Sequence, residues 1–219
     1  MIRCYPAGLH ASRGRPLKRI TVLSLLVSAS LSHAPAWAQE SSGSAAPPLP
    51  DEIARQLPKG DVVITYAAGQ LTDSPRTDYL VAVHGAGDTR EQPTPRPLLI
   101  FVQKPDGHYR LAARNDLVVM RADDGGQCDP FNDSADGLVI KNRYFTVQNE
   151  VACGAHWTDY ITFRFDPKRQ DWVFHKEISQ AWRLNDKPDG DALIADPATV
   201  TDSDSKRPVT FSEWRPREP

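Results

Sequence analysis

The stretch at residues 96–121, RPLLIFVQKPDGHYRLAARNDLVVMR, decides the fold. It begins with an apolar run at 98–103 and then reaches KPDG at 104–107, where proline fixes φ and glycine supplies a positive φ, as in a tight turn. An extended pattern resumes at 109–113, is interrupted at 115–116 and then returns. This stretch therefore predicts three successive antiparallel strands, a β-meander.

Further strands are expected on both sides of this meander. Apolar runs and alternating patterns predict them at 61–66, 79–83, 138–141, 143–148, 157–165 and 172–177, with 182–184 as an extension. In the clearest, WTDYITFRF at 157–165, Asp159 is the one polar residue on a face shared by Trp157, Ile161, Phe163 and Phe165. Only residues 49–57 have a helical pattern. The fold class is therefore mostly β, an antiparallel meander forming a sandwich, a partly open barrel or propeller-like blades, with one short N-terminal helix.

The first 38 residues have the three parts of an export signal. Four basic residues lie within 13–19, an apolar run follows at 20–31, and Ala36-Trp37-Ala38 has the small-residue pattern of a cleavage site. The apolar run is shorter than the roughly 20 residues of a transmembrane helix, and no later run is long enough. We therefore expect cleavage near Ala38–Gln39, a periplasmic or secreted location, and no transmembrane segment in the mature chain.

Cleavage would leave an acidic chain. Residues 1–38 hold five basic and no acidic residues, so 21 Lys and Arg would remain against 28 Asp and Glu, a formal charge of −7. This charge argues against nucleic acid or an anionic membrane surface as the main partner, because both require a basic face. The composition further predicts a disordered lead-in at 39–48, a β-rich domain at 49–185, and a polar C-terminal tail at 186–219 that docks, if at all, through 209–214.

Two cysteines, Cys128 and Cys153, remain in the mature chain, and in an exported protein they predict a disulfide. The bridge would tie the Gly/Asp-rich loop 122–137 to the strand at 157–165. Two interpretations stay open: the bridge only stabilises this loop, or 123–131 and 152–157 form one rigid binding edge. The candidate binding residues on that edge are Asp123, Asp124, Asp129, Phe131, His156 and Trp157.

The sequence contains no catalytic motif and no metal-ligand spacing. The histidines of the mature chain, at 84, 108, 156 and 175, lie outside the H-x-x-x-H, H-E-x-x-H and Cys-His patterns, and no G-x-S-x-G or phosphate-binding loop occurs. We therefore predict no catalytic residues, no metal site and no cofactor. A divalent cation at the acidic clusters 123–136 or 186–191 stays open as an alternative.

Three pieces of sequence carry a family resemblance: RPLLIFVQKPDG at 96–107, GLVIKN at 137–142 and YITFRFD at 160–166. Over about 60–177 the chain resembles a family of exported bacterial proteins of unknown function, small β-rich domains distantly similar to FG-GAP/VCBS-type repeat segments. In such repeats the first hairpin carries a D-x-N-x-D-G calcium loop. The matching place, DSPRTD at 73–78, lacks the middle ligand and the glycine. The resemblance implies no activity and no catalytic residues.

The leading hypothesis is a non-enzymatic, exported, disulfide-stapled β domain. It would bind an envelope or extracellular macromolecule, with a protein as the partner, as an inhibitor, an immunity-type protein or an adaptor. One alternative is a hydrolase or carbohydrate-acting enzyme that uses His84 or His156 with loop carboxylates. The other alternative is a structural repeat-type module.

Overall fold

The computed structural model describes residues 47–131, 137–187 and 190–217, so the predicted export signal and most of the lead-in lie outside the described residues. One short helix, α1 (Asp51–Ala54), precedes the strands. The strands are β1 (Asp61–Gly69), β2 (Asp78–Gly85), β3 (Arg96–Gln103), β4 (Tyr109–Val119), β5 (Leu138–Lys141), β6 (Tyr144–Val151), β7 (His156–Asp166), β8 (Asp171–Leu184), β9 (Leu193–Ala195) and β10 (Thr199–Asp202). No helix among the described residues has the length and apolar character needed to cross a membrane.

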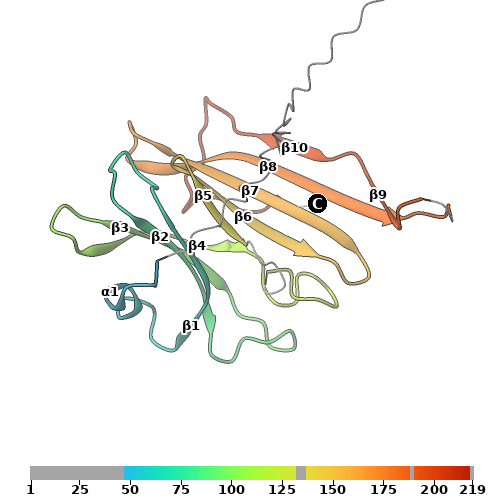
Figure 1. Cartoon of the computed structure of the whole chain (residues 1–219), viewed down its shortest axis with the longest axis horizontal. Coiled ribbons are helices and arrows are strands. Elements are labelled where there is room, and N and C mark those ends of the chain that lie inside the picture. The colour runs from blue at the N-terminus through green and yellow to red at the C-terminus, as the bar shows by residue number, and fades with distance from the viewer. Residues whose placement is uncertain (1–46, 132–136, 188–189, 218–219) are drawn as a thin grey trace, which may run out of the picture. The chain divides into compact units, whose positions relative to one another are not determined.

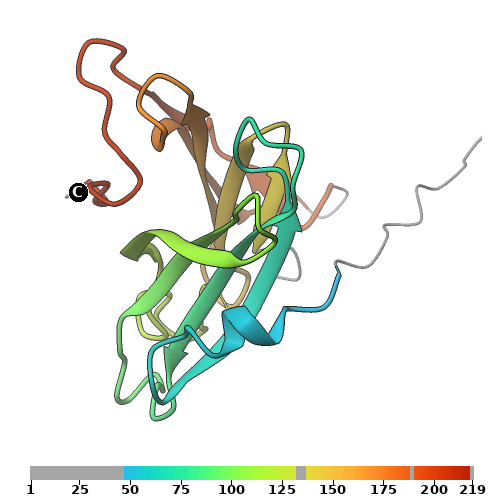
Figure 2. The ribbon, with the colours of Figure 1, turned by 90° about the vertical axis from the view of Figure 1, so that its left-hand side faces the viewer.

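The strands form two antiparallel sheets, which Figures 1 and 2 show as two layers. The four-stranded sheet has the order β1-β2-β3-β4. The six-stranded sheet has the order β10-β8-β7-β6-β5, with β9 pairing the far end of β8. The predicted fold class is confirmed. The arrangement is that of a β sandwich, because the described strands form two packed sheets and no closed barrel.

The larger core lies between the two sheets. Leu80, Leu98 and Ile100 from the four-stranded sheet belong to one buried cluster with Ile161 and Phe163 from the six-stranded sheet. On β7 this burial follows the predicted alternation from Ile161 to Phe165, whereas Trp157 and Asp159, on the same face, are only partly buried. The core therefore fixes which face of the six-stranded sheet points inward.

A smaller core covers the other face of the four-stranded sheet. Val81, Leu99 and Phe101 pack there against Ile53 of α1. Both faces of β2 and β3 are therefore buried, and for this reason their sequences are continuous apolar runs rather than alternating ones. The helix itself is shorter than the predicted 49–57: it ends at Ala54, and the hydrogen bonds of Gln56 and Leu57 reach back only three residues, as in turns.

The turn between β5 and β6 is the one predicted at residue 142. Asn142 and Arg143 both have a positive φ, 54° and 66°, as in the two-residue turns that match the twist of a hairpin. Lys141 accordingly pairs with Tyr144 across the turn.

The strand break predicted at 115–116 is wrong. β4 runs through these residues as one strand, although its register with β3 shifts there. The side-chain oxygen of Asn115 accepts hydrogen bonds from the backbone N–H groups of Leu117 and Val118, both at 2.8 Å. Asn115 therefore stabilises a bulge instead of ending a strand, and residues 96–121 form two strands rather than three.

The C-terminal segment is more structured than its polar composition suggests. β9 and β10 both pair with β8, although neither was expected from the sequence. Phe211 is fully buried and Trp214 is 5% exposed, both in the larger core. The Asn115 amide donates to the carbonyl oxygens of Phe211 (2.7 Å) and Trp214 (3.0 Å), so the bulge in β4 also holds this segment.

Candidate functional site

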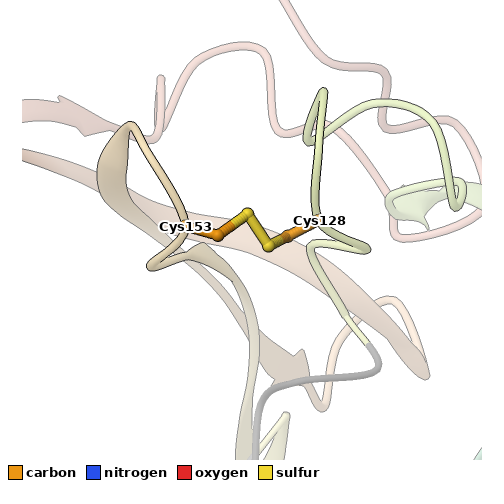
Figure 3. Close-up of a disulfide and its surroundings, with 2 residues drawn as sticks. All are labelled: Cys128 and Cys153. Atoms are coloured by element: carbon orange, nitrogen blue, oxygen red, sulfur yellow. A yellow bond between two sulfur atoms is a disulfide. The ribbon is translucent and has the colours of Figure 1, made fainter.

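The predicted disulfide between Cys128 and Cys153 is confirmed (Figure 3). It joins the loop that follows β4 to the segment between β6 and β7, with 6.1 Å between the two Cα atoms. Beside it, the backbone N–H of Glu150 donates to the carbonyl oxygen of Pro130 at 2.7 Å. The loop after β4 is therefore attached to the six-stranded sheet by a covalent bond and a backbone hydrogen bond.

Asp129, one of the predicted binding residues, holds this loop to the four-stranded sheet. Its carboxylate accepts two hydrogen bonds from Arg96, at 2.6 and 2.5 Å. Arg96 is 5% exposed and also donates to Asp88 at 2.8 Å. Burial alone would raise the pKa of Asp88, but hydrogen bonds from Thr94 and Arg96 outweigh it and lower that pKa. These charges are paired inside the fold, which indicates a structural role for Asp129.

Phe131 has a structural role too. Its side chain is 2% exposed and belongs to the larger core, and its backbone N–H donates to Asp129 at 3.0 Å. Asp123 and Asp124 lie at the surface, where both interact with Arg121. Of the four loop residues predicted to bind, Asp124 lines a cavity of about 490 Å³, and Asp129 lines a separate cavity of about 400 Å³ together with His84 and Arg96.

The two predicted residues of β7 do not act together. Neighbouring residues of a strand point to opposite faces, so His156 and Trp157 face opposite sides of the sheet. Trp157 lies on the same face as Ile161 and lines a cavity, whereas His156 pairs with Trp182 on β8 and is not part of the wall of that cavity. The structure therefore brings Asp124 and Trp157 to the walls of one depression and leaves the other four predicted residues out of it.

This depression, which we call the groove, lies on the inner face of β7 and β8 where that face continues past the core. It consists of two adjoining cavities of about 490 Å³ and 280 Å³, both lined by Met120. The larger cavity is bounded by the end of β4, by Ile161 and by the C-terminal residues Trp214 and Pro216. The smaller cavity is bounded by Trp157 and by residues 179–181 and 197–199. Figure 1 shows β7 and β8 as long antiparallel neighbours in the six-stranded sheet.

Two carboxylates lie in the groove, one in each cavity. Asp159 is paired across the strands with Ser179, and Glu177 with Ile161, so both carboxylates are on the inner face and diagonal to each other. Burial raises the pKa of Asp159, and the Ser179 hydroxyl donates to its carboxylate. The pKa of Glu177 is raised by burial and then by the negative charge of Asp159.

Neither carboxylate forms an ion pair with a residue that the structure describes. Within the described ranges, no Lys, Arg or His nitrogen lies within 4.0 Å of Asp159 or Glu177 in an ion pair. Arg217 lowers the pKa of Glu177 only from a distance, and its guanidinium donates to the Thr201 hydroxyl at 3.2 Å. The groove therefore combines apolar walls with two carboxylates that have no ion-pair partner among the described residues.

Sequence reasoning named neither carboxylate as a site residue. Asp159 did give a signal, since it is the one polar residue on an apolar strand face. Glu177 gave none, because its place beside Asp159 depends on the register of β8 and on a bulge between Thr162 and Phe163.

The other predicted sites are occupied by contacts within the protein. Asp78, at the place matching a calcium loop, is fully buried and accepts backbone hydrogen bonds from Leu71 and Gln103, both at 3.0 Å. His84 lies 3.9 Å from Asp88, whose carboxylate already binds Arg96. In the part of the chain that the structure describes, no group of three or more His, Cys, Asp or Glu residues is placed to hold a metal ion. Asp133, Asp136 and Asp189 of the acidic clusters lie outside the described residues.

Comparison of the chain with protein-family models, with curated proteins and with solved structures gives no match.

Proposed function

We propose that this protein is an exported binding domain whose groove holds a segment of a protein partner in the envelope or outside the cell. The observation that carries the proposal is the groove itself. Its volume and its apolar lining with few polar groups are typical of binding sites. Leu117 of β4, 43% exposed, lines the larger cavity and Trp157 of β7 lines the smaller one, so a ligand that covers these apolar surfaces removes them from water.

The disulfide supports the location outside the cytoplasm. Disulfides form and persist in oxidising compartments, and Cys128 and Cys153 form one here. The export pattern at 1–38 points to the same compartments. An inhibitor, an immunity-type protein and an adaptor are three forms that such a binding domain can take.

A carbohydrate-acting hydrolase is the second candidate, favoured by the carboxylates of Asp159 and Glu177 on neighbouring strands of one groove. Binding comes first because an acid/base pair needs surroundings that push the two pKa values apart. In this groove, burial raises the pKa of both Asp159 and Glu177. The histidines named for this alternative, His84 and His156, do not line the groove. The resemblance to repeat-type modules stays a prediction.

The test is capture of a partner by the tagged mature chain from periplasmic and culture-supernatant extracts under non-reducing conditions. Three proteins are compared: the native protein, Ala181→Trp and Leu184→Trp. Ala181 is an exposed residue that lines the smaller cavity, so the new indole fills the groove. Leu184 is 72% exposed on the same strand but lines neither cavity, which makes it the matched control.

We expect the native protein and the Leu184→Trp variant to retain one stoichiometric protein that Ala181→Trp retains at least tenfold less. Equal retention by all three proteins would place binding elsewhere on the molecule. Absence of any stoichiometric partner would count against the proposal itself.

A further inference from the structure

We propose that the groove is a cation subsite in which Asp159 and Glu177 together hold the guanidinium group of an arginine side chain from the partner. The identity of the partner as a protein rests on the proposed function above. The cation preference rests on the charges and walls of the groove.

The two carboxylates are placed to share one cation. On the same face of an antiparallel pair, diagonal side chains have Cβ atoms within about 7–8 Å, and carboxylates can close that gap. A guanidinium carries five N–H donors in a planar fork, so it can bind two carboxylates at once, whereas an ammonium is a point charge. The diagonal placement of Asp159 and Glu177 therefore favours arginine over lysine.

The protein already contains a filled example of this arrangement. Arg96 lies between Asp88 and Asp129 and donates hydrogen bonds to both carboxylates. Asp159 and Glu177 form a similar pair of acceptors with no arginine of the described chain between them. Removing two carboxylates from water without a cation is costly, and an incoming guanidinium offsets that cost.

The other charged groups around the groove leave it negative. Arg121 interacts with Asp123 and Asp124, and Asp116 accepts from Arg114 at 2.6 Å. Arg217 donates to Thr201 and lies beyond ion-pair distance of Glu177. An approaching cation therefore meets two unpaired carboxylates, with Asp124 and Asp116 nearby on the wall.

The walls match the rest of an arginine side chain and its apolar neighbours. Trp157 lies at one end, and Leu117, Ile161 and Trp214 line the other. Arginine buries its methylene stem on such surfaces and stacks its guanidinium on aromatic rings. A bare metal ion fits less well, because no three His, Cys, Asp or Glu side chains among the described residues are grouped closely enough to hold one.

The probe is the tripeptide acetyl-Leu-Arg-Leu-amide, compared with the same peptide carrying citrulline, a neutral isostere of arginine. Binding is measured by titration calorimetry and by the indole N–H signals of Trp157 and Trp214. The variants are Asp159→Asn and Glu177→Gln, singly and together, with Asp196→Asn as the control. Asp196 pairs with Arg183 and lines neither cavity. Thermal melts confirm that each variant is folded.

We expect the arginine peptide to bind at least tenfold more tightly than the citrulline peptide. Each single groove variant should weaken arginine binding at least fivefold, the double variant should remove the preference, and Asp196→Asn should change nothing. Since burial raises the pKa of both carboxylates, the preference should disappear on acidification at a pH above their ordinary values of 3.8 and 4.5.

Equal affinity for the two peptides, or an arginine preference that survives in the double variant, would overturn the cation subsite. The two proposals fail separately. If the Ala181→Trp variant still retains the partner while the native protein prefers the arginine peptide, the groove is a cation site but does not hold the partner, and the proposed function is wrong. If Ala181→Trp loses its partner but no preference exists, the groove binds the partner without an arginine.

Discussion

At the scale of single residues, the carboxylates of this protein differ in whether the fold compensates them. Asp88 is buried with Arg96 and with Thr94 as a donor, and its pKa is lowered. Asp159 and Glu177 are half-buried without a cation, and the pKa of each is raised. Residues that destabilise the free protein in this way are typical of functional sites, because the groups that bind a ligand often lower the stability of the protein without it.

Asp159→Asn should therefore raise the free energy of unfolding at pH 7. The raised pKa means that, as pH increases above 3.8, the unfolded chain releases this proton before the folded protein does, so ionisation of Asp159 costs stability. Asparagine removes the charge and keeps an acceptor for Ser179. Urea unfolding at several pH values should show that the variant has a higher free energy of unfolding than the native protein at pH 7, and that this difference vanishes below pH 3.8. A variant that is less stable than the native protein at pH 7 would contradict the claim that the ionised Asp159 carboxylate destabilises the fold.

The surroundings of the candidate site residues depend on contacts between residues that are distant in the sequence. Asp129 and Phe131 were predicted to bind; the structure places Asp129 against Arg96, 33 positions away in the sequence, and Phe131 in the larger core. Asp159 was visible as a polar residue on an apolar face. Its role in the proposed site depends on Glu177, and the pairing of β7 with β8 brings the two residues close together.

At the scale of elements, β4 and the C-terminal segment depend on each other. Asn115 is 2% exposed, and its side chain binds the backbone on both sides of the bulge and at Phe211 and Trp214. Because the C-terminal segment forms part of the groove through Trp214 and Pro216, this one amide also positions a wall of the proposed site.

Asn115→Ala should lower the free energy of unfolding by about 2–4 kcal/mol, since buried backbone groups lose their partners. The matched control is Asp116→Ala, an exposed neighbour whose change should stay within roughly 0.5 kcal/mol. Urea unfolding measures both, and limited proteolysis should show faster cleavage near 209–214 in Asn115→Ala alone. Equal stability of the two variants would mean that Asn115 does not hold the segment.

The sequence predicted the existence and type of most elements but not this dependence. Strands β5 to β8 follow apolar patterns and turn residues that are local, so they were predicted close to their observed bounds. Asn115 looked like a turn residue because asparagine favours turns, whereas here the same hydrogen-bonding capacity stabilises a bulge. β9 and β10 were missed because their few apolar residues gain stability only beside β8.

At the scale of the described molecule, the loop after β4 is held by three different interactions. The disulfide binds it to the six-stranded sheet, the Arg96–Asp129 pair binds it to the four-stranded sheet, and Phe131 anchors it in the core. Asp124 on this loop then forms part of the groove wall. The bridge predicted from the sequence thus stabilises a loop and shapes one edge of the proposed site.

Reduction of the disulfide should lower the free energy of unfolding by about 3–4 kcal/mol, as expected for closure of a loop of 25 residues. The melting temperature should fall by roughly 2–4 °C for each kcal/mol. Thermal melts with and without reductant measure this change. The Cys128→Ser/Cys153→Ser double variant is the control, and its melt should not respond to reductant. A native melt that is equally unresponsive would show that the bridge does not stabilise the fold.

The proposed function requires that the inner face of β7 and β8, and not the outer face of the same sheet, binds the partner. We would place a photo-crosslinking amino acid at Met120 in the groove or at Tyr160, whose side chain points to the opposite face. Each protein would be irradiated in periplasmic and culture-supernatant extracts. We expect one discrete adduct from position 120 that disappears with Ala181→Trp, and none from position 160. An adduct from position 160, with none from position 120, would contradict the proposed function.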